Sequence, residues 1–238
     1  MVATILPLTL TGVELHRGGR RILGPVSLTL GGPGITIVMG PNGSGKTSLL
    51  QVMHGLDRVS RGQVTWQRDA VEVRARQAFV FQTPILMRRK VVDCIAYPLR
   101  LDGVGRGPAR ARAAELAATV GLADALDKPS LVLSGGEKQK LALARALIRG
   151  PEVLFLDEPC ANLDGRSTRD IEAILNRARD SGTRIVMSTH DIGQARRLAD
   201  EVLFLHDGLV CDFAPSAEFF ETPRAVEAAA YLKGELLS

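Results

Sequence analysis

The sequence has 238 residues, 45% of them hydrophobic and 24% charged, which suits one large globular domain or a core with an inserted subdomain. No segment has the roughly 18 consecutive apolar residues of a membrane-spanning helix, and the first ten residues lack the basic start of a signal peptide, so we expect a cytoplasmic protein. The net charge of +4 allows an anionic partner. An aromatic content of 4% argues against a base-stacking surface, and we expect no nucleic-acid partner.

The first third of the sequence contains short segments with strand patterns. Residues 8–15 alternate apolar and polar side chains, and 24–30 follow after a glycine-containing turn, which predicts an antiparallel pair. The apolar run 35–39 predicts a buried strand, and the spacing of apolar residues over 49–56 predicts a helix after it. Two further strands complete this part, and they are expected at 62–67 and 77–81.

After residue 90 the sequence pattern changes twice, first to a helical segment and then to alternating strands and helices. From about 91 to 149 the sequence is rich in Ala, Leu and Arg with helical spacing, which predicts a helical insertion. Strands and helices then alternate, the strands being expected at 153–156, 183–188, 202–206 and 209–213, and the helices at 169–180, 192–199, 217–220 and 224–237. This alternation favours a doubly wound, mostly parallel sheet in an α/β fold. We expect a single domain over 1–238, with a core at 1–82 and 151–238 and a helical subdomain at about 83–150.

The most specific local pattern is a glycine-rich turn between the strand predicted at 35–39 and the helix after it. Its residues are Gly40, Pro41, Asn42, Gly43, Ser44, Gly45, Lys46, Thr47 and Ser48. In a strand–turn–helix context, successive backbone N–H groups wrap a phosphate and the helix dipole favours its charge. Lys46 supplies a positive charge for the β- and γ-phosphates, and the Thr47 hydroxyl is placed to hold Mg²⁺. The turn therefore predicts a nucleotide-binding loop.

A second glycine-rich segment starts the last helix of the insertion, which is expected to run to Arg149. Ser134 followed by Glu137 has the spacing of a capping box, which is a purely structural explanation. Gly135 and Gly136, however, weaken the first helical turn and expose N–H groups at a helix N-terminus, where anions bind. The sequence thus predicts two phosphate-binding helix ends, one at Lys46 and one at Ser134.

The run Leu133-Ser134-Gly135-Gly136-Glu137-Lys138-Gln139 resembles the signature motif of the ATP-binding-cassette (ABC) ATPases. In that family the signature of one subunit closes over the nucleotide held by the phosphate-binding loop of another. The resemblance covers nearly the whole sequence and implies a P-loop fold with a mostly parallel sheet, an antiparallel β subdomain and an inserted helical subdomain. It also implies ATP and Mg²⁺ as cofactors and a homodimer with ATP, whose two sites are joined by a loop that residues 160–164 resemble.

Further motifs of the family follow in order, and the resemblance assigns a role to each. The strand at 153–156 ends in Asp157, which would reach Mg²⁺, and Glu158, which would polarise the attacking water. Such an acidic pair is otherwise a solvated strand end. His190 matches the switch histidine that contacts the γ-phosphate, and Gln82 matches the glutamine that senses Mg²⁺ and water. The expected catalytic residues are Lys46, Glu158 and His190, and the expected metal-binding residues are Thr47, Gln82 and Asp157.

One position departs from the family pattern. ABC ATPases stack adenine on an aromatic residue ahead of the phosphate-binding loop, and Arg17, next to His16, occupies that position here. A guanidinium can also stack on a base, so Arg17 is included among the predicted nucleotide-binding residues. The alternative, a solvated turn residue, stays open.

The resemblance implies an ATPase subunit bound to transmembrane permease subunits at the cytoplasmic face of a bacterial inner membrane. The segment 83–98 corresponds to the permease-facing surface, although its basic run at 87–90 can also be read as solvated charge. The segments 79–82, 189–200 and 218–236 resemble the ATPase subunits of tungstate/molybdate-type importers. This similarity predicts ATP-driven import of an oxyanion such as tungstate, with an extracytoplasmic solute-binding protein as a further partner.

Four alternatives come from other functional classes. An ATPase of an exporter or lipoprotein-release system would differ in the permease that it binds. A soluble ABC ATPase that acts on ribosomes or DNA usually has two cassettes or long insertions, which we do not expect here. The Ser134 segment and His190 argue against a P-loop kinase, and the intact Lys46, Glu158 and His190 argue against a scaffold that does not hydrolyse ATP.

Overall fold

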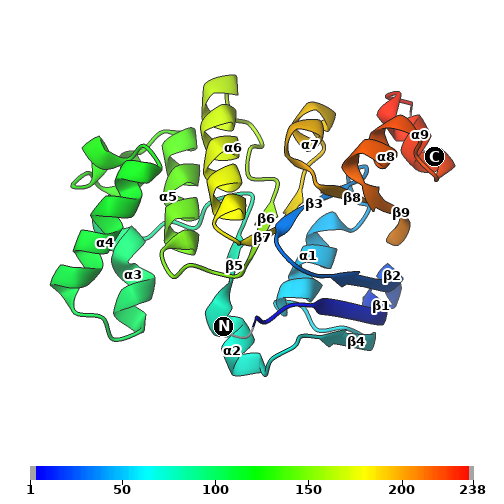
Figure 1. Ribbon diagram of the computed structural model, residues 1–238, viewed down its shortest axis with the longest axis horizontal. Coiled ribbons are helices and arrows are strands. Elements are labelled where there is room, and N and C mark those ends of the chain that lie inside the picture. The colour runs from blue at the N-terminus through cyan, green and yellow to red at the C-terminus, as the bar shows by residue number, and fades with distance from the viewer. Residues whose placement is uncertain (1–3, 236–238) are drawn as a thin grey trace.

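The computed structural model describes residues 4–235, which form two β-sheets and the helices around them (Figure 1). The smaller sheet is antiparallel and has the order β2-β1-β4, with β1 at Leu8–Arg17, β2 at Arg20–Leu30 and β4 at Arg61–Thr65. Alternate side chains of β1, among them Leu8 and Leu10, are buried on one face of this sheet. The antiparallel opening predicted from this alternation is confirmed.

The larger sheet has six strands in the order β5-β6-β7-β3-β8-β9, and they are β5 Gln77–Val80, β6 Val153–Asp157, β7 Arg184–Ser188, β3 Gly34–Met39, β8 Glu201–His206 and β9 Leu209–Pro215. Neighbouring strands from β5 to β8 are parallel, and β9 is antiparallel to β8. Every residue of β3, β6 and β7 is buried, because both faces of the sheet are covered. The predicted mostly parallel, doubly wound sheet is confirmed.

Successive residues of the central strands face two different hydrophobic clusters. In β6, Leu154 and Leu156 belong to one cluster, whereas Val153 and Phe155 belong to the other. On the Phe155 side lies α1 (Lys46–His54), between the two sheets in Figure 1. On the opposite side lie α5 (Gly135–Leu147), α6 (Gly165–Asp180) and α7 (Ile192–Leu198). This layering places the start of α1 at the carboxyl end of β3.

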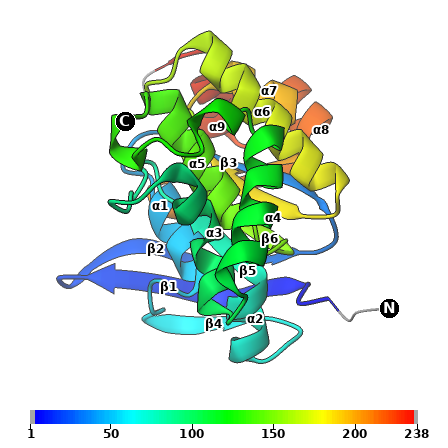
Figure 2. The same ribbon diagram turned by 90° about the vertical axis from the view of Figure 1, so that its left-hand side faces the viewer.

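The predicted helical insertion forms α3 (Val91–Leu101), α4 (Arg106–Thr119) and α5, at the left end of Figure 1 and toward the viewer in Figure 2. On α4 the buried residues are Ala109, Ala113 and Ala117, and their spacing of four makes one narrow apolar stripe. Buried residues of these helices share one hydrophobic cluster with the central strands. The helices are confirmed, and the division into a core and a separate subdomain at 83–150 stays a prediction.

One helix was missed, and several helix boundaries differ from the predictions. A short helix α2 (Ala70–Arg76) was missed because Val73 is its only buried residue, although Asp69 caps it by accepting hydrogen bonds from the N–H groups of Val71 and Glu72. Helix α6 begins four residues before the predicted start, because Asp164 accepts a hydrogen bond from the Ser167 N–H. Helix α5 ends at Leu147 and not at Arg149.

The C-terminal part adds two short helices, α8 (Ser216–Glu221) and α9 (Val226–Leu232). The predicted helix at 224–237 is therefore shorter than expected, and residues 236 and 237 lie outside the described residues. Within 4–235, none of the helices combines the length and apolarity that crossing a bilayer requires.

Candidate functional site

The glycine-rich turn lies between the end of β3 and the start of α1. Its first residue, Gly40, packs so closely on β8 that a Cβ atom there would lie 2.0 Å from the Leu205 carbonyl oxygen. The N-cap residue of α1 is Gly45, which has φ 102° and offers no side chain to cap the helix. The first N–H groups of α1 therefore have no capping side chain, which is the arrangement that a bound phosphate satisfies.

Lys46, the first residue of α1, is 6% exposed. Its ammonium donates hydrogen bonds to the carbonyl oxygens of Gly40 (2.9 Å) and Pro41 (3.0 Å). Burial lowers the pKa of Lys46, while the carboxylates of Glu158 and Asp157 act in the opposite direction. A cation is thus held beneath the turn by carbonyl groups and by acidic neighbours.

Two hydroxyl groups hold the carboxylate of Asp157 at the end of β6. Thr47 Oγ1 donates to Oδ2 (2.8 Å), and Ser188 Oγ donates to Oδ1 (2.7 Å). The Glu158 N–H donates in turn to Ser188 Oγ (3.0 Å). Ser188 ends β7, where the strand register pairs it with Asp157. No local sequence pattern assigns a role to Ser188, because only the pairing of β6 with β7 reveals this bridge.

Glu158 has a backbone φ of 43°, in the left-handed region that non-glycine residues rarely adopt. Its carboxylate Oε2 lies 3.1 Å from Nδ1 of His190, and its Oε1 lies 3.9 Å from Nζ of Lys46. The side chain of Glu158 is 15% exposed, whereas that of His190 is 58% exposed. A largely but not fully buried carboxylate therefore lies between a cation and an imidazole that faces solvent.

These groups surround one cavity of about 660 Å³. The predicted site residues in its lining are Asn42, Gly43, Gly45, Lys46, Thr47, Ser48, Gln82, Glu158 and His190. Ile22, Ala161 and Asn162 also line it. Ile22 was missed because an isolated isoleucine in a strand carries no functional signal, and residues 160–164 had been assigned only to the junction between two subunits.

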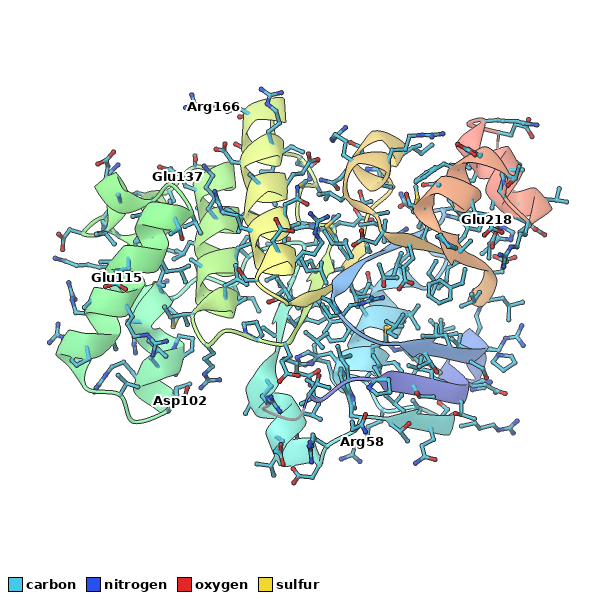
Figure 3. All side chains as sticks on the ribbon, in the orientation of Figure 1. Arg58, Asp102, Glu115, Glu137, Arg166 and Glu218 are labelled. Atoms are coloured by element: carbon cyan, nitrogen blue, oxygen red, sulfur yellow. The ribbon has the colours of Figure 1, made fainter. Side chains whose placement is uncertain are left out.

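Eight predicted residues are not part of this lining. Gly40, Pro41 and Ser44 belong to the turn itself, and Asp157 is hydrogen-bonded to the lining residue Thr47. The other four are Arg17, Ser134, Gly135 and Gly136. Arg17 forms an ion pair with Asp57, which sequence analysis did not consider. Ser134, Gly135 and Gly136 lie at the start of α5. In Figure 3, Glu137 near this helix start lies at the same end of the molecule as Arg166 on α6. Nucleotide binding by Arg17, Ser134, Gly135 and Gly136 stays a prediction.

The start of α5 has the capping box expected from the sequence. Ser134 Oγ accepts a hydrogen bond from the Glu137 N–H (3.3 Å), and Glu137 Oε2 accepts one from the Ser134 N–H (2.8 Å). Helix packing also accounts for the glycine at position 136, because a Cβ atom there would lie 2.4 Å from Ser167 Oγ on α6. This close approach explains a glycine at 136 without any ligand.

The side chains around the cavity fit a nucleotide with Mg²⁺. Thr47, Asp157 and Gln82 offer a hydroxyl, a carboxylate and an amide, and Mg²⁺ prefers oxygen ligands. A set with one carboxylate leaves coordination positions for water and phosphate oxygens. Ser44 Oγ, in the same turn, is buried without a hydrogen-bond partner among the described residues.

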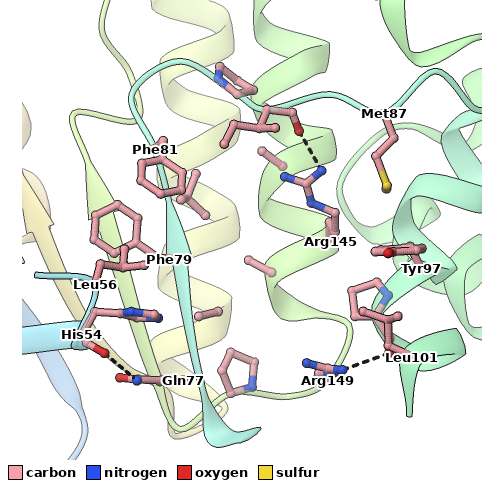
Figure 4. Close-up of a pocket in the computed structure, with 18 of the residues that line it drawn as sticks. His54, Leu56, Gln77, Phe79, Phe81, Met87, Tyr97, Leu101, Arg145 and Arg149 are labelled. Atoms are coloured by element: carbon pink, nitrogen blue, oxygen red, sulfur yellow. Dashed lines mark hydrogen bonds between the residues drawn. The ribbon is translucent and has the colours of Figure 1, made fainter. Parts of the chain in front are cut away.

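A second, mainly apolar groove of about 530 Å³ lies between β5 and the helices α3 and α5 (Figure 4). Phe79, Phe81, Met87, Tyr97 and Leu101 are among the residues that line it. Two arginines of the α5 region close its side, since Arg145 donates to the Ile85 carbonyl (2.7 Å) and Arg149 to that of Pro98 (3.1 Å). Ile85 is 61% exposed and Leu101 is 64% exposed, so the groove has an apolar rim.

Comparison with known proteins agrees with this geometry. The ABC transporter family profile matches residues 23–161. The chain is 39% identical over 207 residues to the tungstate uptake system ATP-binding protein TupC of Peptoclostridium acidaminophilum, covering 86% of this chain and 97% of that protein. It is 38% identical over 235 residues to the Fe(3+) ions import ATP-binding protein FbpC of Streptomyces coelicolor, covering 94% of this chain and 66% of that protein. The solved structure of cbiO1 from Clostridium perfringens, part of the ABC transporter complex cbiONQ, has a TM-score of 0.82 and 26% identity over 91% of both chains.

Proposed function

The chain belongs to the ABC transporter family, whose ATP-binding subunits hydrolyse ATP, and we propose that it powers solute import by hydrolysing ATP in the cavity at Lys46. The observation that carries the proposal is the convergence of Lys46, Glu158 and His190 on one cavity beside an uncapped helix N-terminus. Residues far apart in the sequence meet there with the charges that phosphoryl transfer to water requires.

Each residue then has a distinct part in hydrolysis. Backbone N–H groups of the turn and the Lys46 ammonium bind the β- and γ-phosphates. Thr47, Asp157 and Gln82 would hold Mg²⁺, which would supply positive charge next to the phosphate oxygens. Glu158 orients the attacking water and accepts its proton. His190, whose Nδ1 contacts the Glu158 carboxylate, would hold that carboxylate and contact the γ-phosphate.

A second copy of the chain completes the site. Ser134, Gly135 and Gly136 are outside the cavity of their own chain, yet they start a helix whose N–H groups suit an anion. Placed over the turn of another copy, they give the nucleotide a second helix N-terminus. Ala161 and Asn162, which belong to the segment proposed to join the two copies, also line the cavity.

The apolar groove is the proposed contact with the transmembrane permease. Its exposed rim at Ile85 and Leu101 and its aromatic lining suit a short apolar helix. The groove also borders the segment after β5 that contains Gln82, so a helix seated there can sense the metal-binding site. This contact would hold the protein at the cytoplasmic face of the membrane.

The proposed solute is an oxyanion such as tungstate, delivered by an extracytoplasmic solute-binding protein. The support is the 39% identity to a protein named for tungstate uptake. A protein named for Fe(3+) import is 38% identical, so the similarity favours import and distinguishes solutes less sharply. Selection of the solute belongs to the permease and the binding protein.

The test is ATP hydrolysis by the purified protein, with size-exclusion chromatography in the presence and absence of MgATP. Glu158→Gln should lower the rate by at least ~100-fold and elute as a dimer with MgATP, because binding persists without the general base. Glu221→Gln, an exposed glutamate on α8, is the matched control and should resemble the wild type. Full activity of Glu158→Gln would exclude this mechanism. Tungstate-stimulated hydrolysis after reconstitution with the permease tests the solute.

A further inference from the structure

A small cavity between α3 and α4 is lined mainly by arginine. Its volume is about 280 Å³, and its lining residues are Arg89, Asp93, Ala96, Arg100, Arg106 and Arg110. Four guanidinium groups against one carboxylate leave a formal charge of +3. None of these residues lines the nucleotide cavity or the apolar groove, so this third cavity is separate from both.

Helix periodicity explains how these side chains meet. Asp93, Ala96 and Arg100 recur at intervals of three and four on one face of α3, and Arg106 and Arg110 are four residues apart on the first turns of α4. Buried alanines on α4 hold the two helices together within one hydrophobic cluster. The cavity is therefore built on packed helices, and its arginines project from fixed positions.

Among the described residues, only one of the four guanidinium groups is paired with a carboxylate. Arg110 Nη1 pairs with Asp93 Oδ1 at 2.6 Å. The guanidinium carbon of Arg89 lies 5.0 Å from the ring centroid of Tyr97, and Arg100 donates to the Val104 carbonyl oxygen, which carries no formal charge. The guanidinium of Arg106 makes no hydrogen bond or ion pair with any residue from 4 to 235.

Asp127, an acidic residue outside the lining, does not neutralise the arginines of the cavity. Asp127 has its pKa lowered by Lys90 first and by Arg110 to a smaller extent. Its carboxylate is already paired with Lys90 at 2.8 Å. Among the described residues, Asp93 therefore remains the one carboxylate that is bonded to a guanidinium of the cavity.

We propose that this cavity binds a tetrahedral oxyanion of the phosphate class, either a free ion or the phosphate of a lipid headgroup. Guanidinium groups present paired N–H donors that match the oxygens of such anions, and a concave cluster of them concentrates positive potential. The volume lies below the roughly 300–1,000 Å³ of pockets for drug-sized ligands, which suits a small anion. The bound anion supplies the negative charge that Arg89, Arg100 and Arg106 lack.

Anion binding in the arginine cavity can change the shape of the apolar groove through Arg89. Arg89 stacks on Tyr97, and the ring of Tyr97 lines that groove (Figure 4). An anion that draws Arg89 into the cavity changes the support of the Tyr97 ring and with it the shape of the groove. This regulatory consequence rests on the proposed permease contact, whereas anion binding itself does not.

The test compares two arginine variants of the full chain on the same helix. Both arginines are exposed on α4. Arg106→Gln removes a charge that lines the cavity and has no bonded partner, and Arg112→Gln removes a charge outside the lining. Calorimetric titrations use inorganic phosphate and tungstate. Sedimentation uses phosphatidylcholine vesicles with and without phosphatidic acid. Phosphate bound at the glycine-rich turn contributes equally to both variants and cancels in the comparison.

We expect about tenfold weaker anion binding by Arg106→Gln than by Arg112→Gln, with unchanged ATP binding in both. If the difference occurs with free ions, the ligand is a soluble oxyanion; if it occurs only with phosphatidic acid vesicles, the ligand is a lipid headgroup. Equal binding by the two variants in every titration would overturn the proposal. ATP binding and hydrolysis are measured separately, so failure of the ATPase mechanism would be distinguishable from failure of this site.

Discussion

Lys46 Nζ lies 3.9 Å from Oε1 of Glu158, so the lysine of the glycine-rich turn and the glutamate after β6 form an ion pair across the nucleotide cavity. Both side chains are largely buried, with exposed fractions of 7% and 15%. The phosphates of a nucleotide must compete with this carboxylate for the lysine, and the carboxylate also repels them. The pair therefore opposes nucleotide binding by a single chain.

Glu158→Gln should consequently bind ATP more tightly than the wild type, even though it does not hydrolyse it. We expect a gain of about fivefold, corresponding to an electrostatic change near 1 kcal/mol. The measurement is a titration with a fluorescent ATP analogue at protein concentrations below those of dimer formation. Glu221→Gln is again the control, and an unchanged or weaker affinity of Glu158→Gln would show that the ion pair does not oppose binding.

Ser188→Ala should impair the metal site, because Ser188 Oγ donates to Asp157 and accepts from the Glu158 N–H. We expect kcat to fall about tenfold and stability to drop by about 1–3 kcal/mol. The Mg²⁺ concentration for half-maximal rate should rise, and this readout separates positioning of Asp157 from a purely structural effect. Ser181→Ala, which removes an exposed hydroxyl at the end of α6, should leave all three quantities near wild type.

Arg17→Ala tests the prediction that the Arg17 guanidinium stacks on the adenine base. If Arg17 leaves Asp57 and stacks on adenine, its loss weakens ATP binding by about two- to fivefold, the range of an exposed cation–π contact. Affinity for inorganic triphosphate, which has no base, should not change. A parallel loss for both ligands would mean that Arg17 acts only as a charge. Arg17→Tyr should restore ATP binding, since a phenol ring stacks on a base without the guanidinium.

His54 should make the protein less stable in mild acid. Its ring contacts Phe79 and Phe155 edge-on, and burial lowers its pKa from 6.5 to about 4. Between these pH values the unfolded chain binds a proton that the folded protein does not, so stability is full above pH 6.5 and falls as the pH drops toward 4.

The contribution of His54 amounts to a loss of about 2 kcal/mol between pH 7.5 and 5. His54→Phe keeps an aromatic ring in place and should remove this part of the pH dependence. Urea unfolding of both proteins at the two pH values measures it. An equal loss of stability in His54→Phe would assign the acid sensitivity to other groups.

The fold class and most of the residues that line the cavity at Lys46 could be predicted from the sequence because their signals are local. Apolar periodicity placed the central strands, and the turn from Gly40 to Ser48 carries its backbone N–H groups within nine consecutive residues. The capping box at Ser134 and Glu137 is equally local. Helix α2 was missed because it buries too little apolar surface to leave a pattern.

Only the tertiary structure decided which distant side chains meet. The strand order brings Ser188 to Asp157, the hairpin of β1 and β2 brings Arg17 to Asp57, and the packing of α3 on α4 brings Arg89 and Arg106 to one cavity. In the sequence, the arginines of the cavity look like ordinary solvated charges of a helical segment. Helix and strand periodicity and backbone hydrogen bonding act over a few residues, and a sequence shows them directly. Convergence of side chains depends on how elements pack, which the chain settles only when it folds.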